Sequence, residues 1–428
     1  MNEDLLQYVW RMGLFSQSDL QTISGETIQI IKRGHLNTDS GPDFSQSRIR
    51  IGEADWVGHV EIHNKASEWY THGHHLDPAY NNTVLHVVRI YDKPVERLDG
   101  SIVPTLEIGD RLFPEVVANF SKLTLSMGWI PCENHLPDID HFTKTMMMER
   151  AVVGRLEKKS EDIIEVFKMC NFDWQSAFYN MLSRNFGFSV NAAAFEMLAK
   201  ALPLRVIDRH RENLHELEAL LFGTAGFLEK DSEDDYSKKL QDEYHYLKKK
   251  FTLQQMDVHL WKHMRMRPAN FPEIRLAQLA SLVHRSSHLF SIVLETKDVK
   301  ELKKLFSTDV SDYWFEHYRF GAPAKSKHGG NLSEHSAELL LINTVVPFLF
   351  SYGKHTGSDH YRQRALELLQ VLKAEENNII DKWKGLKVTP ANAYDTQALL
   401  HHKKFSCDLK LCLNCPVGNK ILQRKIEE

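Results

Sequence analysis

The stretch PDFSQSRIRIGEADWVGHVEIH (residues 42–63) indicates more about the fold than any other part of the chain. It is rich in isoleucine and valine, and Gly52 separates two runs that each have the composition of a β-strand. Acids lie near both of its ends, at Asp43 and Glu61. Glu61, His63 and Lys65 are two residues apart, so a strand would direct all three side chains to one face.

Short β-like segments continue on both sides of this stretch. A helix over 5–15 precedes them, with apolar residues at helical spacing. Asp99-Gly100 separates the last two runs and is typical of a hairpin turn. The predicted strands are 27–32, 47–51, 56–63, 84–91 and 102–108.

The composition changes near Trp129, and the rest of the chain is helix-like. The pattern predicts helices over 143–168, 191–200, 207–221, 236–250, 273–294 and 337–352. We therefore expect an α+β protein. A small mixed β-sheet domain would span residues 1–125, a linker 126–142, and a large all-α region 143–428 with a cysteine-containing C-terminal segment.

Composition and charge indicate a soluble, cytoplasmic protein. Of 428 residues, 42% are hydrophobic and 26% charged, and the net charge of −4 provides no global basic field for nucleic acid. A local groove can still be basic. The acidic start Met1–Asp4 does not resemble a secretory signal, and the apolar stretch 339–350 is too short to span a membrane. Five unevenly spaced cysteines argue against a disulfide framework.

Asp43 and Glu61 form the first candidate site. Carboxylates are the ligands that Mg²⁺ and Mn²⁺ prefer, and two acids sharing an ion must lie within about 6 Å of each other. His63 or Lys65 would then assist the attacking water in phosphodiester hydrolysis. A purely structural interpretation stays open, in which Asp43 bonds nearby backbone and Glu61 pairs with Lys65 or Arg48.

Histidines form the second candidate site. Six of the 23 histidines fall within 28 residues: His59, His63, His72, His74, His75 and His86. The glycine-hinged pair His72 and His74 can chelate a transition metal, with Asp77 as a further ligand. The alternative is a solvated loop supported by the packing of Trp69 and Tyr80.

Cysteines near the C-terminus form the third candidate site, a structural metal site. Cys407, Cys412 and Cys415 with His402 can complete a tetrahedral zinc site, and Cys132 is an alternative fourth ligand. An iron–sulfur arrangement and a set of buried free cysteines also fit the spacing.

Arginines precede a predicted helix in the segment 265–275. Arg267 and Arg275 can bind phosphate at the N-terminus of that helix. They can equally cap neighbouring helices or pair with acids.

The order of Pro42-Asp43 and Glu61-Ile62-His63 resembles the PD-(D/E)xK restriction-endonuclease-like nuclease superfamily. That resemblance implies a helix followed by a mixed sheet, with Asp43 and Glu61 as metal ligands. His63 fills the position of the superfamily's lysine, with Lys65 as a migrated substitute, and histidine is only partly charged at neutral pH. The acid that the superfamily sometimes carries on the preceding helix would be Glu3.

The whole chain also resembles an uncharacterised bacterial family known as a domain of unknown function. The segments that carry this resemblance are 41–44, 58–63, 72–80, 267–272, 317–321 and 412–415. That family brings no established reaction with it.

Three functional hypotheses follow from these patterns. The first is a metal-dependent nuclease-like protein that hydrolyses or binds nucleic-acid phosphodiesters. The second is a non-catalytic adaptor with a degenerate nuclease-like domain, which binds protein or RNA. The third is a histidine-centred metal hydrolase of a small substrate.

Overall fold

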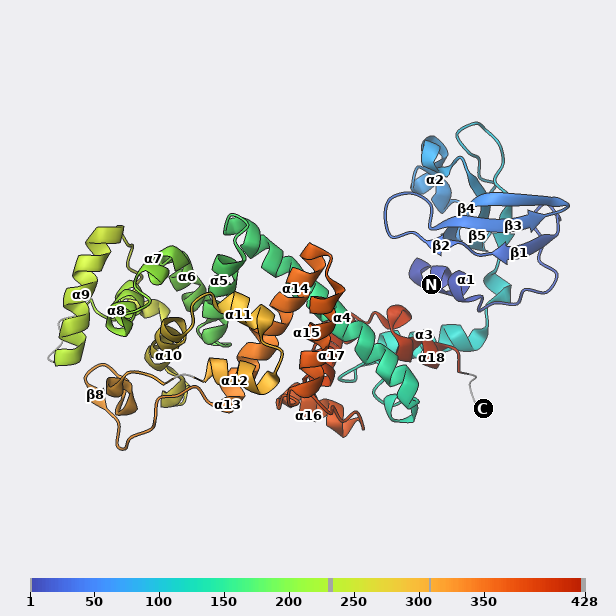
Figure 1. The fold of residues 1–428 in the computed structure, drawn as a ribbon. Helices are drawn as coiled ribbons and strands as arrows, with labels where there is room; N and C mark the ends of the chain where they lie inside the picture. Colours follow the sequence, from blue (N-terminus) through green and yellow to red (C-terminus); the bar gives the residue numbers. More distant parts are fainter. Residues whose placement is uncertain (1, 230–233, 308, 425–428) are drawn as a thin grey trace. The chain divides into compact units, whose positions relative to one another are not determined.

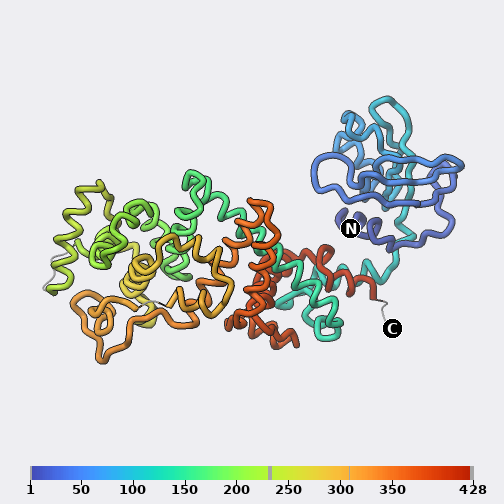
Figure 2. Tube along the Cα trace, in the orientation of Figure 1, coloured from blue at the N-terminus to red at the C-terminus, as the bar shows by residue number. Residues whose placement is uncertain are grey.

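The computed structural model describes residues 2–229, 234–307 and 309–424 (Figures 1 and 2). Its contacts divide the chain into two compact units. The sheet unit comprises Met1–Met148, Leu386–Val388 and His402–Glu428, and the helical unit comprises Glu149–Gly385 and Thr389–His401. A mixed sheet followed by a large helical region confirms the predicted α+β class. These two units differ from the predicted domains 1–125 and 143–428, because the C-terminal segment His402–Glu428 groups with the sheet.

The sheet runs in the order β1-β3-β4-β5-β6, and the short β2 pairs with β3. Strands β1, β3 and β4 form an antiparallel meander, whereas β5 is parallel to β4 and β6 is parallel to β5. The bounds are β1 Ile28–Lys32, β2 His35–Leu36, β3 Phe44–Ile51, β4 Ala54–Lys65, β5 Thr83–Ile90 and β6 Thr105–Glu107.

The prediction that a hairpin at Asp99-Gly100 joins the last two strands is wrong. A tight turn does form there, and it closes only the single antiparallel bridge between Glu96 and Ile102. Beyond Ile102 the chain crosses back, so that β6 pairs in parallel with β5. A turn residue indicates a local reversal, but the pairing of the flanking strands depends on long-range contacts.

Helix α1 (Glu3–Met12) precedes the sheet and packs against β4 (Figure 1). The Asn2 side chain caps its N-terminus, and Gly13 ends it in the left-handed conformation. Its apolar residues Leu5, Leu6, Val9 and Trp10 are buried, so the opposite face carries the polar side chains.

The connection from β4 to β5 is a crossover, as a parallel pair requires. It contains α2 (Glu68–Thr71) and two single turns, η1 (His74–Leu76) and η2 (Pro78–Tyr80). Trp69 and Tyr80 anchor it, since both are buried in one cluster with Val88, Val95 and Val103. The Trp69 ring nitrogen also donates a hydrogen bond to the Glu96 carbonyl.

The remaining helices and turns of the sheet unit flank the helical unit in sequence. They are η3 Gly109–Arg111, α3 Pro114–Leu125, η4 Leu136–Asp138, η9 Lys403–Cys407, η10 Cys412–Asn414 and α18 Pro416–Leu422. The C-terminal helix α18 packs against α3. The Asn119 amide fixes this contact by donating hydrogen bonds to the carbonyls of Ile421 and Arg424.

The helical unit begins within α4 (His141–Met169), which starts in the sheet unit. Its helices after α4 are α5 Trp174–Phe186, α6 Ala192–Ala201, α7 Leu204–Arg209, α8 Leu214–Thr224, α9 Asp235–Phe251, α10 Pro272–Arg285, α11 Leu289–Glu295, α12 Val299–Phe306, α13 Glu334–Leu340, α14 Val346–Thr356, α15 Asp359–Val371, α16 Asn378–Gly385 and α17 Ala393–His402. Its shorter elements are η5 Val258–Leu260, η6 Pro268–Asn270, η7 Asp312–Phe315, β7 His317–Arg319, β8 Ala322–Pro323 and the π-turn η8 Leu341–Val345.

Two predicted helices are interrupted. The run 273–294 breaks after Arg285, where His288 takes a left-handed conformation (φ +52°) and α11 starts anew. The run 207–221 contains the end of α7 and the start of α8, which the Asn213 side chain caps. Apolar periodicity continues through both breaks, because the successive helices bury residues in the same unit.

One helix among the described residues, Glu334–Thr356, is long and apolar enough to cross a membrane. Most of it is buried within the structure. A buried apolar helix is typical of the core of a soluble protein.

Candidate metal centre

Strand β4 directs the side chains of Glu61 and His63 to one face of the sheet. Both are almost completely buried, which is unusual for polar groups in a small domain. On the neighbouring strand, His86 stands in register with Glu61, and its ring lies beside His63. The two strands therefore place a carboxylate and two imidazoles side by side in the interior.

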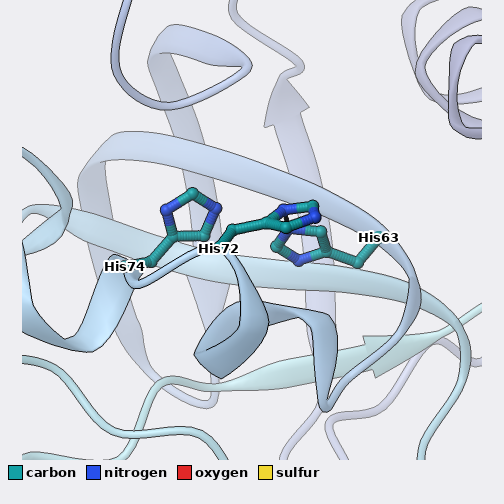
Figure 3. Close-up of side chains that lie close together, drawn as sticks. All are labelled: His63, His72 and His74. Carbon is teal, nitrogen blue, oxygen red and sulfur yellow. Dashed lines mark hydrogen bonds between the residues drawn. The ribbon is translucent and has the colours of Figure 1, made fainter.

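The crossover brings two further imidazoles to this face. His63, His72 and His74 each offer a ring nitrogen, and these nitrogens lie within 4.8 Å of one another. Figure 3 shows the three rings gathered together, with His63 on the strand and His72 and His74 on the turn that follows α2. Gly73 between the two turn histidines takes φ +78°, a left-handed conformation that glycine adopts most easily.

The distances suit the ligands of a single ion. His63 Nε2 lies 3.1 Å from His72 Nδ1 and 3.6 Å from Glu61 Oε1. His74 Nε2 lies 3.1 Å from the same carboxylate oxygen. Nitrogen and oxygen atoms bound to one tetrahedral metal ion are separated by roughly 3.3 Å. Three ring nitrogens thus lie close together, and Glu61 Oε1 lies at ligand spacing from two of the three histidines.

The His74 Nε2 atom is buried, and among the described residues it makes no hydrogen bond, although Glu61 Oε1 lies 3.1 Å away. A buried polar atom without a partner costs roughly 1–3 kcal/mol. A metal ion at this point would remove that cost.

Asp43 lies beside Glu61, and each carboxylate accepts a hydrogen bond from a backbone N–H at or next to the other residue. The Asp43 backbone N–H donates to Glu61 Oε2 at 2.9 Å, and the Ile62 N–H donates to Asp43 Oδ2 at 3.0 Å. Burial raises the pKa of both carboxyl groups well above their usual range, and the Glu61 charge raises the pKa of Asp43 further. Two acids held this closely in a poorly solvated place favour a bound cation.

Helix α1 contributes the third acid and an amide. Gln7 Nε2 donates to Asp43 Oδ1 at 2.9 Å. Glu3 is four residues earlier on the same helical face, and its charge raises the pKa of Asp43 and Glu61. Burial raises the pKa of Glu3, and its electrostatic interactions with His72 and His74 oppose this rise, so this helix acid lies near the histidines.

The buried histidines are neutral at pH 7. Burial lowers the pKa of His63 to about 2 and that of His86 to about 3, and the neighbouring imidazoles lower the pKa of His63 further. Burial also lowers the pKa of His74. A neutral imidazole offers a lone pair to a metal, whereas a protonated one repels it.

Aromatic rings hold these imidazoles in place. Tyr80 stacks on His74 with ring centroids 3.8 Å apart, and Trp69 contacts both His74 and His86 edge-on or tilted. Trp69 and Tyr80 therefore act as supports of the site, in addition to their packing in the core.

A model of the family "Protein of unknown function (DUF2851)" matches residues 3–378. The chain belongs to the DUF2851 family. No curated protein and no solved structure matches it. The matched range of the DUF2851 model contains all of the acids and histidines described above and ends before Cys407.

Two predicted site residues of this DUF2851 chain are exposed and do not belong to the group of converging ligand atoms. Lys65 is exposed at the end of β4, where its charge acts on Asp92. Asp77 is exposed, and its side chain caps η2 by accepting from the Ala79 N–H. Lys65 is the last residue of β4, two residues beyond His63.

The two predicted arginines have different surroundings. Arg275 is buried in α10, donates to Asn270, Gln278 and Ser336, and lies over the Phe188 ring. Arg267 is exposed before η6 and lines a cavity together with Arg275. The contacts of Arg275 are those of a structural arginine, and phosphate binding here stays a prediction.

Sequence reasoning missed Gln7, and it counted His86 among the clustered histidines without assigning it a specific role. Gln7 lies on a polar helix face with no local signal that it would meet Asp43. His86 sits within a continuous apolar run, VLHVV, and a polar residue at that position is the signal that could have identified it.

Proposed function

We propose that the sheet unit binds a divalent transition-metal ion at Glu61, His63, His72 and His74 and uses it to hydrolyse phosphodiester bonds. The observation that carries this proposal is the convergence of ring nitrogens from His63, His72 and His74, with the buried Glu61 Oε1 beside His63 and His74. The ion would supply Lewis acidity and an activated water molecule.

The ligand set favours Mn²⁺ or Zn²⁺ over Mg²⁺. Imidazole nitrogen suits zinc and other transition metals, whereas Mg²⁺ strongly prefers oxygen ligands. Asp43 and Glu3 add oxygen donors close by, which Mn²⁺ accepts alongside nitrogen. The histidines therefore shift the expected metal away from magnesium.

The neighbouring residues have distinct roles in this proposal. His86 Nε2 lies 2.8 Å from His63 Nδ1, so it fixes the ring orientation and leaves His63 Nε2 directed toward the ion. Asp43, whose pKa is raised, can hold a proton or accept one beside the ion. His63 is neutral, and it therefore replaces the superfamily's lysine as a ligand and not as a positive charge.

The arrangement of elements supports a phosphodiester as substrate. A helix, an antiparallel meander and a parallel strand carry Glu3, Asp43 and Glu61 in the order that the nuclease-like resemblance implies. Without an ion these acids repel a phosphate group, and a bound divalent ion reverses the local charge. Nucleic acid is accordingly the proposed partner.

Calorimetric titration of Mn²⁺ and Zn²⁺ into metal-stripped protein tests the site. We expect one ion per sheet-unit site in wild type and no binding there in Glu61→Gln/His74→Ala. The matched control is His75→Ala, because His75 lies in the same turn but contacts only the Tyr70 ring among the rings of the described residues. Equal binding by all three proteins would contradict the proposal.

Cleavage assays then distinguish the substrates. Single- and double-stranded DNA and RNA oligonucleotides are compared with bis(4-nitrophenyl) phosphate, each with Mn²⁺ and after chelation. Metal-dependent cleavage of oligonucleotides supports the nuclease proposal. Metal binding without any cleavage favours the non-catalytic adaptor.

A histidine-centred hydrolase of a small substrate is the second candidate. It is favoured by His72 and His74, which lie on the crossover and provide half of the proposed ligands. In that case we expect turnover of the small diester alone, and loss of that turnover in Glu61→Gln/His74→Ala.

A further inference from the structure

A second cluster of metal-binding side chains lies in the sheet unit, away from the histidines. Cys132, His402, Cys407, Cys412 and Cys415 line one small cavity of about 20 Å³. That volume corresponds to about one water-sized sphere, which also suits a single metal ion. Four of the chain's five cysteines meet here, although 274 residues separate Cys132 from Cys407.

One pair of donors in this cluster has the spacing of metal ligands. Cys415 Sγ lies 3.5 Å from His402 Nε2. A zinc ion bound at about 2.3 Å by sulfur and about 2.0 Å by nitrogen separates its ligand atoms by roughly 3.5 Å. Cys412-x₂-Cys415 is in addition the short spacing with which many zinc sites begin.

The backbone around the cluster is tightly constrained. The π-turn η9 ends at Cys407, Lys410 takes a left-handed conformation (φ +53°), and η10 begins at Cys412. A Cβ at Gly418 would overlap the Cys412 carbonyl oxygen, so α18 approaches this turn closely only because residue 418 is glycine.

The thiols of the cluster lie close to one another. Burial raises the pKa of Cys132, Cys407 and Cys412, and the nearby sulfurs raise the pKa of each further. Each sulfur therefore lies close enough to a neighbouring sulfur for a charge on one to disfavour ionisation of the other. A bound divalent cation lowers the pKa of the thiols, and the thiols that bind it are deprotonated.

We propose that Cys407, Cys412 and Cys415 bind a structural zinc ion, whose fourth ligand is His402 or Cys132. With Cys132 as the fourth ligand, the ion joins the C-terminal segment to the N-terminal part of the sheet unit, next to contacts already present. Lys410 Nζ donates to the Ser126 carbonyl, and Arg11 donates to the Leu413 carbonyl. The three thiolates lie outside residues 3–378, and this inference does not depend on the proposed function.

Metal analysis of the purified full-length chain, with the histidine site emptied by Glu61→Gln/His74→Ala, tests the proposal. We expect one zinc ion per chain, and less than about a tenth of that in Cys412→Ser/Cys415→Ser made in the same background. Cys170→Ser is the matched control, because Cys170 lies in the helical unit. His402→Ala and Cys132→Ser, made separately, identify the fourth ligand by loss of zinc.

Substitution with Co²⁺ provides a readout that does not depend on the folding of a variant. Thiolate-to-cobalt charge-transfer bands are expected in the wild-type chain and in Cys170→Ser. Protein that lacks zinc and binds neither added Zn²⁺ nor Co²⁺ would overturn the proposal. Bound iron with acid-labile sulfide would equally overturn it, in favour of an iron–sulfur cluster.

Discussion

At the scale of single residues, the candidate site depends on polar groups that the fold holds at a cost. Asp43 and Glu61 lie in a place that raises the pKa of both, and His74 Nε2 is buried without a hydrogen bond among the described residues. Such unsatisfied groups are concentrated where proteins bind ions or perform chemistry.

Replacing His86 tests how the site is supported. His86→Ala removes the partner of His63 Nδ1 and frees the His63 ring to rotate. We expect the affinity for Mn²⁺ or Zn²⁺ to fall about 10–100-fold, as measured by calorimetry. His75→Ala in the same region should bind as wild type does. Unchanged affinity in His86→Ala would show that His63 needs no such support.

A buried acid in the helical unit makes stability depend on pH. Glu218 is 1% exposed, accepts hydrogen bonds from Tyr236 and Ser311, and has its pKa raised by burial to about 7. Because the folded-state pKa exceeds the unfolded one, the folded state is favoured at low pH and loses stability as the pH rises from about 4.5 to 7. The full loss is roughly 3 kcal/mol.

The corresponding variant is Glu218→Gln, which cannot ionise. Urea unfolding should find it close to wild type at pH 5 and more stable than wild type at pH 8. Glu196→Gln is a suitable control, since Glu196 is a surface acid paired with Lys200 and Arg184. If Glu218→Gln exceeded wild type in its free energy of unfolding by the same amount at both pH values, the raised pKa of Glu218 would be contradicted.

At the scale of elements, the parallel pairing of β4 and β5 decides where the site forms. The crossover that this pairing requires returns over the face that carries Glu61 and His63, and it brings His72 and His74 with it. An antiparallel pair would have been joined by a short hairpin and would have left these histidines elsewhere.

The close packing of α8 against α9 in the helical unit can be tested by substituting a glycine. A Cβ at Gly223 of α8 would overlap the Tyr244 ring of α9, whereas nothing lies within 4 Å of a Cβ at Gly385 of α16. We expect Gly223→Ala to destabilise the helical unit by about 1–3 kcal/mol through overpacking. Gly385→Ala should instead be neutral or stabilise by up to about 1 kcal/mol. Thermal unfolding of both variants measures the difference, and equal shifts would refute it.

At the scale of the whole molecule, two units with separate cores should unfold in separate steps. Mn²⁺ at about 100 times its dissociation constant should stabilise the sheet unit by about 2.7 kcal/mol. Scanning calorimetry should therefore show one transition that rises with Mn²⁺. The other transition should respond at pH 8 to Glu218→Gln and not to the metal. A single transition that responds to both changes would mean that the units unfold together.

Much of this organisation could be predicted from local patterns. The α+β class, the strands around residues 42–63 and most helices follow from apolar periodicity and turn residues, which act between near neighbours. Asp43, Glu61, His63, His72 and His74 were also predicted as candidate site residues from their residue types and spacing. The DUF2851 match confirms that the chain belongs to a family of unknown function.

Other features depend on contacts between residues far apart in the chain, and only the tertiary structure decided them. Parallel pairing of β5 with β4, the approach of Glu3 and Gln7 to Asp43, and the meeting of Cys132 with Cys407 are of this kind. Strand order and burial place these groups together and raise or lower their pKa values. The sequence by itself determined which metal-binding side chains the chain carries, and the fold determined which of them lie close together.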